Sequence, residues 1–328
     1  MSDQFIKIGN EKGLNAYLLP YSATIARITF PDKNNVQTDL ILGFDTPKEY
    51  ETDTFYMGRT IARVANRIRN ATFEFDGRVY HLPPNNGSHF IHGGSKGPCF
   101  KTWEIVRDSP ESVSFSCKVE ELEDDLPGNA KIDVTYTIND RNQIIVEHYA
   151  TCTKPGILAI TNHAYWNLDN SETILDHYLE SEAAEYVETD ETACPTGAIL
   201  SVTSTNYDFR KARKLRSIAN NDSAVLLDND LVLPTVSPSV VPRTHLRFWS
   251  EKSGIEMAIV TSYPVIHLYA GYYLNGAGRN GEIYSKNKAL AIEPQFHSAA
   301  PNFSHFPDVS LRPGQNYSQE IVYTFSHI

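Results

Sequence analysis

Several short segments of the chain alternate between apolar and polar residues, and this period of two restricts the fold more than any other feature of the sequence. The alternation is strict in residues 112–119 and 132–138, and it returns in 255–260 and 317–325. A period of two places every second side chain on the same face of a β-strand. Each such strand has one apolar face, which has to be buried against another layer. The pattern therefore predicts packed β-sheets.

Further strand signals lie between these segments. Residues 23–30, 143–149 and 267–273 are rich in β-branched and aromatic side chains. In the stretch 72–80, Asp76-Gly77 separates two alternating segments. Asp-Gly tolerates the positive φ angles of a type I′ turn, so this stretch is predicted to be a β-hairpin.

Helical periodicity is scarce, and short helical turns are expected only near 47–50 and 209–213. The 18 prolines and 18 glycines are spread along the chain, with no linker or repeat between the strand segments. We therefore predict an all-β fold, a large antiparallel β-sandwich with few short helices, in which residues 1–328 form a single domain.

The net charge of −11 and the absence of a basic cluster argue against a nucleic-acid partner, because an acidic surface repels phosphate. A neutral small molecule suits this charge balance better. The acidic run 120–125 is interpreted as a solvated loop, because it has no turn glycine at the spacing of a cation-binding loop.

The sequence also suggests a cellular environment. No apolar run has the length of a signal peptide or of a membrane span. The four cysteines are widely scattered, with no CxxC pair, which fits neither a zinc site nor a disulfide framework. We expect reduced thiols, a cytoplasmic protein and no membrane partner.

Five polar clusters interrupt the strand pattern in ways that a core does not require. They span residues 58–69, 85–94, 161–168, 227–233 and 291–302. Taken singly, each has a structural explanation: His92 could cap a turn, His163 could be a satisfied core residue, and Glu293 could pair with Arg67. Asp228 could lie in an ordinary surface turn.

In this order, the clusters resemble the aldose 1-epimerase (galactose mutarotase) family, and the similarity runs nearly from end to end. The more specific segments are Asn162-His-Ala-Tyr-Trp-Asn-Leu168 and His92-Gly-Gly94. The remaining matches are Leu42-Gly-Phe-Asp45, Tyr56-Met-Gly-Arg59, Ala65-Asn-Arg-Ile68, Pro195-Thr-Gly197, Tyr207-Asp-Phe-Arg210 and Leu311-Arg-Pro-Gly314.

The resemblance implies a single-domain β-sandwich with an open sugar-binding cleft and no cofactor. It implies an aldose 1-epimerase, an isomerase that interconverts the α and β anomers of a free hexose. By the same resemblance, Glu293 is the general base and His163 the general acid. The sugar contacts implied are Asn66, Arg67, His92 and Asp228, with Tyr165 and Trp166 flanking the ring, and His267 lies where a sugar-contacting glutamine is common.

These residue types suit the reaction. A neutral pyranose needs convergent donors and acceptors and an apolar wall. Anomer exchange needs one group to take the proton of the C1 hydroxyl and another to protonate the ring oxygen. We expect burial to raise the pKa of Glu293 above its usual value, and His163 to titrate near neutrality. A fall in turnover on the acid side is then expected as Glu293 becomes protonated.

Several positions depart from the family pattern: Ala62, Asn229-Asp230, His267, Pro294 and His297-Ser298. They leave two alternatives open. One is a mutarotase for hexose phosphates, which would need cations at the cleft rim such as Arg59, Arg63 and Arg69. The other is a sugar-binding or regulatory relative with reduced activity.

A zinc site built from His81, His89 and His92 is disfavoured, because their spacing suits neither a helix face nor a closed site. Neither the preferred sugar nor an oligomeric state follows from these residues.

Overall fold

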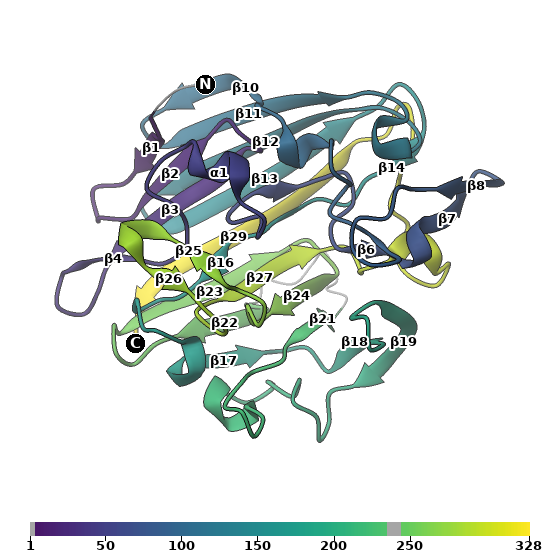
Figure 1. Cartoon of the computed structure of the whole chain (residues 1–328). Helices are drawn as coiled ribbons and strands as arrows, with labels where there is room; N and C mark the ends of the chain where they lie inside the picture. Colours follow the sequence, from purple (N-terminus) through teal and green to yellow (C-terminus); the bar gives the residue numbers. More distant parts are fainter. Residues whose placement is uncertain (1–3, 235–243) are drawn as a thin grey trace.

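The computed structural model describes residues 4–234 and 244–328, and its largest element is a nine-stranded antiparallel sheet. The last strand of the chain lies in the middle of this sheet, hydrogen-bonded to strands from two earlier parts of the sequence (Figure 1). The strands, in spatial order, are β10 (Glu104–Ser109), β11 (Ser112–Val119), β12 (Ala130–Asn139), β13 (Gln143–Thr151), β29 (Tyr317–His327), β23 (Ile255–Thr261), β22 (Leu246–Trp249), β17 (Tyr178–Ser181) and β20 (Arg213–Lys214).

A six-stranded antiparallel sheet packs against the nine-stranded sheet, and one hydrophobic cluster contains side chains from both. Its strands, in spatial order, are β16 (Tyr165–Trp166), β27 (Leu290–Gln295), β24 (Val265–Tyr269), β21 (Asp228–Val232), β18 (Glu185–Thr189) and β19 (Pro195–Ser201). The protein is therefore a large antiparallel β-sandwich, as the alternating pattern predicted.

Smaller elements surround these two sheets. A four-stranded sheet consists of β1 (Ile6–Gly9), β2 (Asn15–Leu19), β3 (Thr24–Pro31) and β4 (Gln37–Asp39). Two-stranded pairs are β5 (Thr60–Ile61) with β15 (Thr161–Asn162), β6 (Arg67–Ile68) with β9 (Phe90–Ile91), β7 (Thr72–Phe75) with β8 (Arg78–His81), β14 (Gly156–Ile157) with β28 (Ser310–Leu311), and β25 (Gly276–Ala277) with β26 (Ile283–Tyr284).

Helical structure is limited to short segments. The single α-helix among the described residues is α1 (Glu49–Thr52). No helix in this part of the chain is long and apolar enough to cross a membrane. The remaining turns are 3₁₀ segments: η1 (Arg69–Ala71), η2 (Pro98–Phe100), η3 (Glu123–Asp125), η4 (Ile174–Asp176), η5 (Leu215–Ile218), η6 (Arg279–Gly281) and η7 (Ala300–Asn302).

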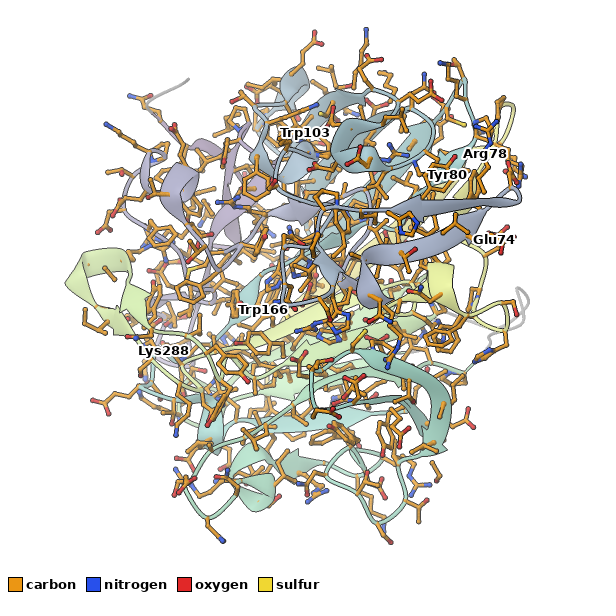
Figure 2. All side chains as sticks on the ribbon, turned by 45° about the vertical axis from the view of Figure 1, so that its right-hand side comes forward. Glu74, Arg78, Tyr80, Trp103, Trp166 and Lys288 are labelled. Atoms are coloured by element: carbon orange, nitrogen blue, oxygen red, sulfur yellow. The ribbon has the colours of Figure 1, made fainter. Side chains whose placement is uncertain are left out.

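Most of the strand and turn predictions are confirmed. β11 has the predicted bounds, and Asp76 and Gly77 have φ angles of 50° and 71° in the turn between β7 and β8. Figure 2 shows this hairpin at the edge of the molecule, with Glu74, Arg78 and Tyr80 along it.

Two local predictions are wrong. The helical turn expected at 209–213 is absent, because the Phe209 carbonyl accepts a hydrogen bond from the Ser181 amide and Arg213 pairs with β17. The strand expected at 267–273 begins two residues earlier and ends at Tyr269. The Ala270 amide still donates to Leu227 in the register of β21 and β24. The chain then turns at Gly271, whose φ is 59° and whose carbonyl accepts the Leu274 amide.

The acidic run is only partly a solvated loop. Asp124 is buried, and its carboxylate accepts hydrogen bonds from the backbone amides of Ser95 and Lys96. Glu123 forms an ion pair with Lys101. These carboxylates therefore fasten the loop to the segment that follows β9.

Candidate active site

A cavity of about 340 Å³ opens beside the outer face of the six-stranded sheet and brings together eight of the nine residues that the resemblance placed at the sugar site, all but Trp166. These are Asn66, Arg67, His92, His163, Tyr165, Asp228, His267 and Glu293. They come from the five polar clusters and from the strand β24, so the clusters meet at one place although they are far apart in sequence.

Three of the charged or titratable residues come from adjacent strands of the six-stranded sheet. Asp228 begins β21, His267 is the middle residue of β24, and Glu293 lies in β27. Along β24 and β27 the alternate residues, such as Leu268 and Ile292, belong to the sandwich core. The period of two therefore separates a polar cavity face from an apolar core face.

The opposite wall of the cavity is formed by loops whose backbone is held in unusual conformations. Asn66 and His92 have φ angles of 58° and 53°, and the Asn66 amide lies 3.3 Å from His92 Nδ1. Gly93, which follows His92, has a φ of 75°, and a Cβ atom there would lie 2.2 Å from the Ala62 carbonyl oxygen. Glycine is thus required after His92, because two backbones approach each other closely there. This local conformation directs His92 toward the cavity.

His163 and Glu293 form the central pair of the cavity. Nε2 of His163 lies 3.5 Å from Oε1 of Glu293, and both side chains are buried. Among the described residues, neither Nδ1 of His163 nor Oε2 of Glu293 has a hydrogen-bond partner. Buried polar atoms are usually satisfied, so these two are available to a bound molecule.

Burial suppresses the charged form of both groups. It raises the pKa of Glu293 to about 8, in the direction that the sequence predicted. It lowers the pKa of His163 to about 3, so the expectation that this histidine titrates near neutrality is wrong. These pKa values leave one titratable proton on the pair at neutral pH, and it rests on Glu293.

His267 has the opposite character. Its Nδ1 lies 2.8 Å from Asp230 and its Nε2 lies 3.1 Å from Asp228. Burial alone would lower its pKa, but the two carboxylates raise it to about 10. Since a neutral imidazole has only one N–H, a histidine that donates to two carboxylates is an imidazolium.

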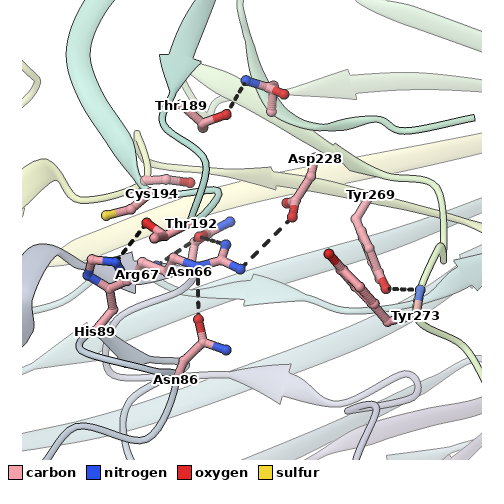
Figure 3. A network of polar contacts seen from close by, with 12 residues as sticks. Asn66, Arg67, Asn86, His89, Thr189, Thr192, Cys194, Asp228, Tyr269 and Tyr273 are labelled. Carbon is pink, nitrogen blue, oxygen red and sulfur yellow. Dashed lines mark hydrogen bonds and ion pairs between the residues drawn. The ribbon is translucent and has the colours of Figure 1, made fainter.

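Arg67 connects both sides of the cavity, as Figure 3 shows. Its guanidinium donates to Asn86 Oδ1 at 3.1 Å, and its Nη2 lies 3.9 Å from Asp228. The structural alternative, in which Glu293 pairs with Arg67, is therefore wrong, because Arg67 contacts Asn86 and Asp228 instead. The Asn86 loop is in turn linked to the β18–β19 hairpin by a 2.9 Å contact between His89 and Thr192.

Trp166 does not flank the cavity, contrary to the expectation. It is fully buried in the sandwich core against Tyr323 and Phe325, and Figure 2 places it deep within the molecule. Tyr165 and Trp166 are successive residues of β16, so their side chains have to point to opposite faces. Tyr165 alone lines the cavity, and its ring centroid lies 4.9 Å from that of His163.

The arginines proposed for a phosphate rim are engaged elsewhere. Arg59 and Arg63 are buried and donate to backbone carbonyls, and Arg69 pairs with Asp190 at 2.8 Å. Arg59 holds the carbonyls of Tyr50 and Asp53 at 2.6 and 2.8 Å. It thereby fixes the loop that carries Tyr56 into the cavity wall.

Sequence reasoning missed several residues of this wall. Tyr56 lies within a motif that was used only for the resemblance. Asp230, which lies outside the wall, was missed as well, although it follows Asp228 at the spacing that shares a strand face. The other missed lining residues are Thr54, Phe55, Asn85, Asn86, Ile91, Tyr269 and Tyr273. In the part of the chain that the structure describes, no group of three or more His, Cys, Asp or Glu residues could hold a metal ion.

The arrangement can bind a polyhydroxylated neutral molecule and move protons on it. Donors and acceptors converge from three sides, and aromatic rings line the remainder of the wall. At the base of the cavity a carboxyl group whose pKa is raised to about 8 lies 3.5 Å from an imidazole, so a proton can pass between them.

Comparison with known proteins agrees with this geometry. Residues 4–324 match the family described as aldose 1-epimerase. The aldose 1-epimerase of Escherichia coli (strain K12) is 30% identical over 328 residues, covering 98% of this chain and 95% of that protein. The galactose mutarotase of Sus scrofa is 32% identical over 318 residues, covering 95% and 91%.

Solved structures show the same similarity. The crystal structure of a GalM/aldose epimerase homologue from C. elegans has a TM-score of 0.96 and 61% identity, and each chain is covered completely. Galactose 1-epimerase from Lactobacillus acidophilus NCFM has a TM-score of 0.83 at 23% identity, covering 98% of this chain and 93% of that one, which shows the shared fold.

Proposed function

The chain belongs to the aldose 1-epimerase family, and we propose that it interconverts the α and β anomers of a free hexose such as galactose or glucose. The observation that carries the proposal is the buried pair of His163 and Glu293, whose Nε2 and Oε1 atoms lie 3.5 Å apart in a polar cavity and which each keep an unpartnered atom among the described residues. The names of the relatives, aldose 1-epimerase and galactose mutarotase, support the same reaction.

The reaction begins with the shared proton on His163, which leaves Glu293 as a carboxylate. Glu293 takes the proton of the C1 hydroxyl, the C1–O5 bond breaks as C1 becomes an aldehyde carbon, and His163 gives its proton to O5. Rotation about C1–C2 turns the other face of the carbonyl toward O5. Closure reverses both transfers, so protons and bonds balance without any other reactant.

The other cavity residues recognise the sugar hydroxyls. Arg67 and Asn66 donate, Asp228 accepts, and Tyr165 covers a C–H face of the ring. His92 closes the wall beside His163, at 5.3 Å between ring centroids. These roles are supported by the position of each residue in the lining of the cavity.

We also propose that residues 1–328 act as one domain in the cytoplasm. The central position of β29 between β13 and β23 supports one domain, because the end of the chain completes a sheet begun by its first half. The four free cysteines support a reducing compartment.

Polarimetry on freshly dissolved α-galactose, α-glucose and their 6-phosphates tests the proposal. We expect faster loss of optical rotation for the free sugars and little acceleration for the phosphates, since Arg59 and Arg63 are buried and Arg69 is paired. Saturable sugar binding with no acceleration would instead identify a sugar-binding protein. Acceleration confined to the phosphates would identify a hexose-phosphate mutarotase.

A further inference from the structure

A row of three ionisable side chains crosses the six-stranded sheet beneath the cavity. Asp230 of β21 is the direct register partner of His267 in β24, and His267 is the direct partner of Glu293 in β27. Directly opposed residues of antiparallel strands have neighbouring side chains on one face, with Cβ atoms about 5 Å apart. The sheet therefore stacks an anion, a cation and the proposed base in one line.

Asp230 is held in place by three hydrogen bonds. Its carboxylate accepts the Ser298 amide at 2.7 Å and the Ser298 hydroxyl at 2.9 Å, besides the 2.8 Å contact to His267. Burial opposes its ionisation, but the hydrogen bond and charge of His267 outweigh burial and lower its pKa. Asp230 does not line the cavity, so it acts on a bound sugar only through its partners.

His267 brings its positive charge to Glu293. Burial is the largest influence on the pKa of Glu293, and the charge of His267 is the largest influence that opposes burial. The titratable groups that face His267 are Asp228 and Asp230 from β21, Glu293 from β27, and His92 and His163 from the neighbouring loops. His297 faces Asp230 from the loop after β27.

We propose that Asp230 is a positioning residue for anomer exchange, which holds His267 as a permanent cation against Glu293 and so favours the carboxylate that the base role requires. The inference rests on the proposed function, in that the carboxylate of Glu293 is taken to be the base. It adds a residue without sugar contact to the machinery, and it gives His267 an electrostatic role besides contact with the sugar.

The first test observes His267 directly and needs no activity. Side-chain ¹⁵N spectra of the full-length protein follow each histidine against pH, and His267→Gln identifies the signal. We expect His267 to stay protonated well above pH 8 in the wild type and to lose its proton at least one pH unit lower in Asp230→Asn. An ordinary histidine titration in the wild type, or one unchanged in Asp230→Asn, overturns the proposal.

The second test measures the pH profile of mutarotation. Loss of the cation in His267→Gln should move the profile to higher pH by about one unit, because a nearby opposite charge shifts a carboxyl pKa by about one to three units. The double variant Asp230→Asn/His267→Gln keeps a neutral hydrogen-bonding pair of similar shape. The pH profile of the double variant should lie between those of the wild type and His267→Gln. Removing the Asp230 charge offsets only part of the loss of the His267 charge, because His267 is one strand from Glu293 and Asp230 is two.

The two ideas fail in different ways. The positioning role is overturned if His267→Gln has the wild-type pH profile, or if the double variant recovers the wild-type profile completely. Asp230 and His267 would then be a structural cross-strand pair. Absence of mutarotation in the wild-type protein overturns the proposed function, while the titration of His267 still reports on the ion pair.

Discussion

Nε2 of His163 lies 3.5 Å from Oε1 of Glu293, although the two residues are 130 positions apart in the chain. His163 follows β15, which pairs with β5, and Glu293 lies in β27 of the six-stranded sheet. The pairing of Tyr165 with Ala291 fixes the separation between them, since each is two residues from a member of the pair. The proposed acid–base pair is thus held by sheet register.

Removing the carboxylate at position 293 should abolish most of the mutarotation. We expect Glu293→Gln to lower kcat by about 10²–10⁴-fold, the usual contribution of a positioned proton acceptor. The control is Glu185→Gln, which removes an exposed carboxylate from the same sheet without touching the cavity. Polarimetry on both variants decides, and near wild-type kcat in Glu293→Gln rules out Glu293 as the base.

The pH profile should be bell-shaped rather than limited by an ordinary carboxyl group. The active pair carries one proton. Glu293 in the free enzyme loses this proton above about pH 8, and His163 then has no proton to give, so kcat/KM should fall there. On the acid side the fall should come only as a second proton binds His163, whose pKa is lowered to about 3. The acid-side fall expected from Glu293 alone is replaced by this profile.

That profile is measured by polarimetry after subtraction of the base-catalysed background reaction. An acid limb centred at about pH 4 to 5, with no alkaline limb near pH 8, would identify Glu293 as an ordinary solvated carboxylate and contradict the shared proton.

Loss of the Arg67 side chain should weaken sugar binding more than it slows proton transfer. Arg67→Met removes the donor that bridges Asn86 and Asp228, and a hydrogen bond to a charged group contributes about 1.5–3 kcal/mol. We expect KM to rise about 10- to 100-fold with a smaller change in kcat. Arg312→Met, which breaks the pair with Asp76 on the β7–β8 hairpin, should leave KM unchanged. A larger loss in kcat than in KM would contradict a purely binding role.

Tyr165 and Trp166 should differ in what their substitution changes. Trp166→Ala should lower the free energy of unfolding by about 3–5 kcal/mol, because it leaves a cavity beside Tyr323 and Phe325 in the sandwich core. Tyr165→Phe keeps the ring and should change stability little while altering KM. Urea unfolding followed by circular dichroism measures the first effect, and the second is read from polarimetry. If Trp166→Ala mainly raises KM, this assignment of the two faces is wrong.

The strands could be predicted from the sequence because their period of two is a local property of the chain. β11 was predicted with correct bounds, and the Asp76-Gly77 hairpin ends one residue after the predicted stretch 72–80. The same period could have placed Trp166 on the core face, since Tyr165 and Trp166 are successive residues. The end of β24 could not be predicted from that period, because the residues up to Tyr273 still favour a strand, whereas the chain turns at Gly271, whose carbonyl accepts the Leu274 amide.

The order of residues was enough to predict the antiparallel sandwich and, through the motifs, the eight residues that meet at the cavity. Their protonation could be assigned only in the folded molecule, because a pKa depends on burial and on charges from other strands. Burial raises the pKa of Glu293 and lowers that of His163, while two carboxylates raise that of His267. The row from Asp230 through His267 to Glu293 likewise exists only through the register of three strands, which no local pattern specifies.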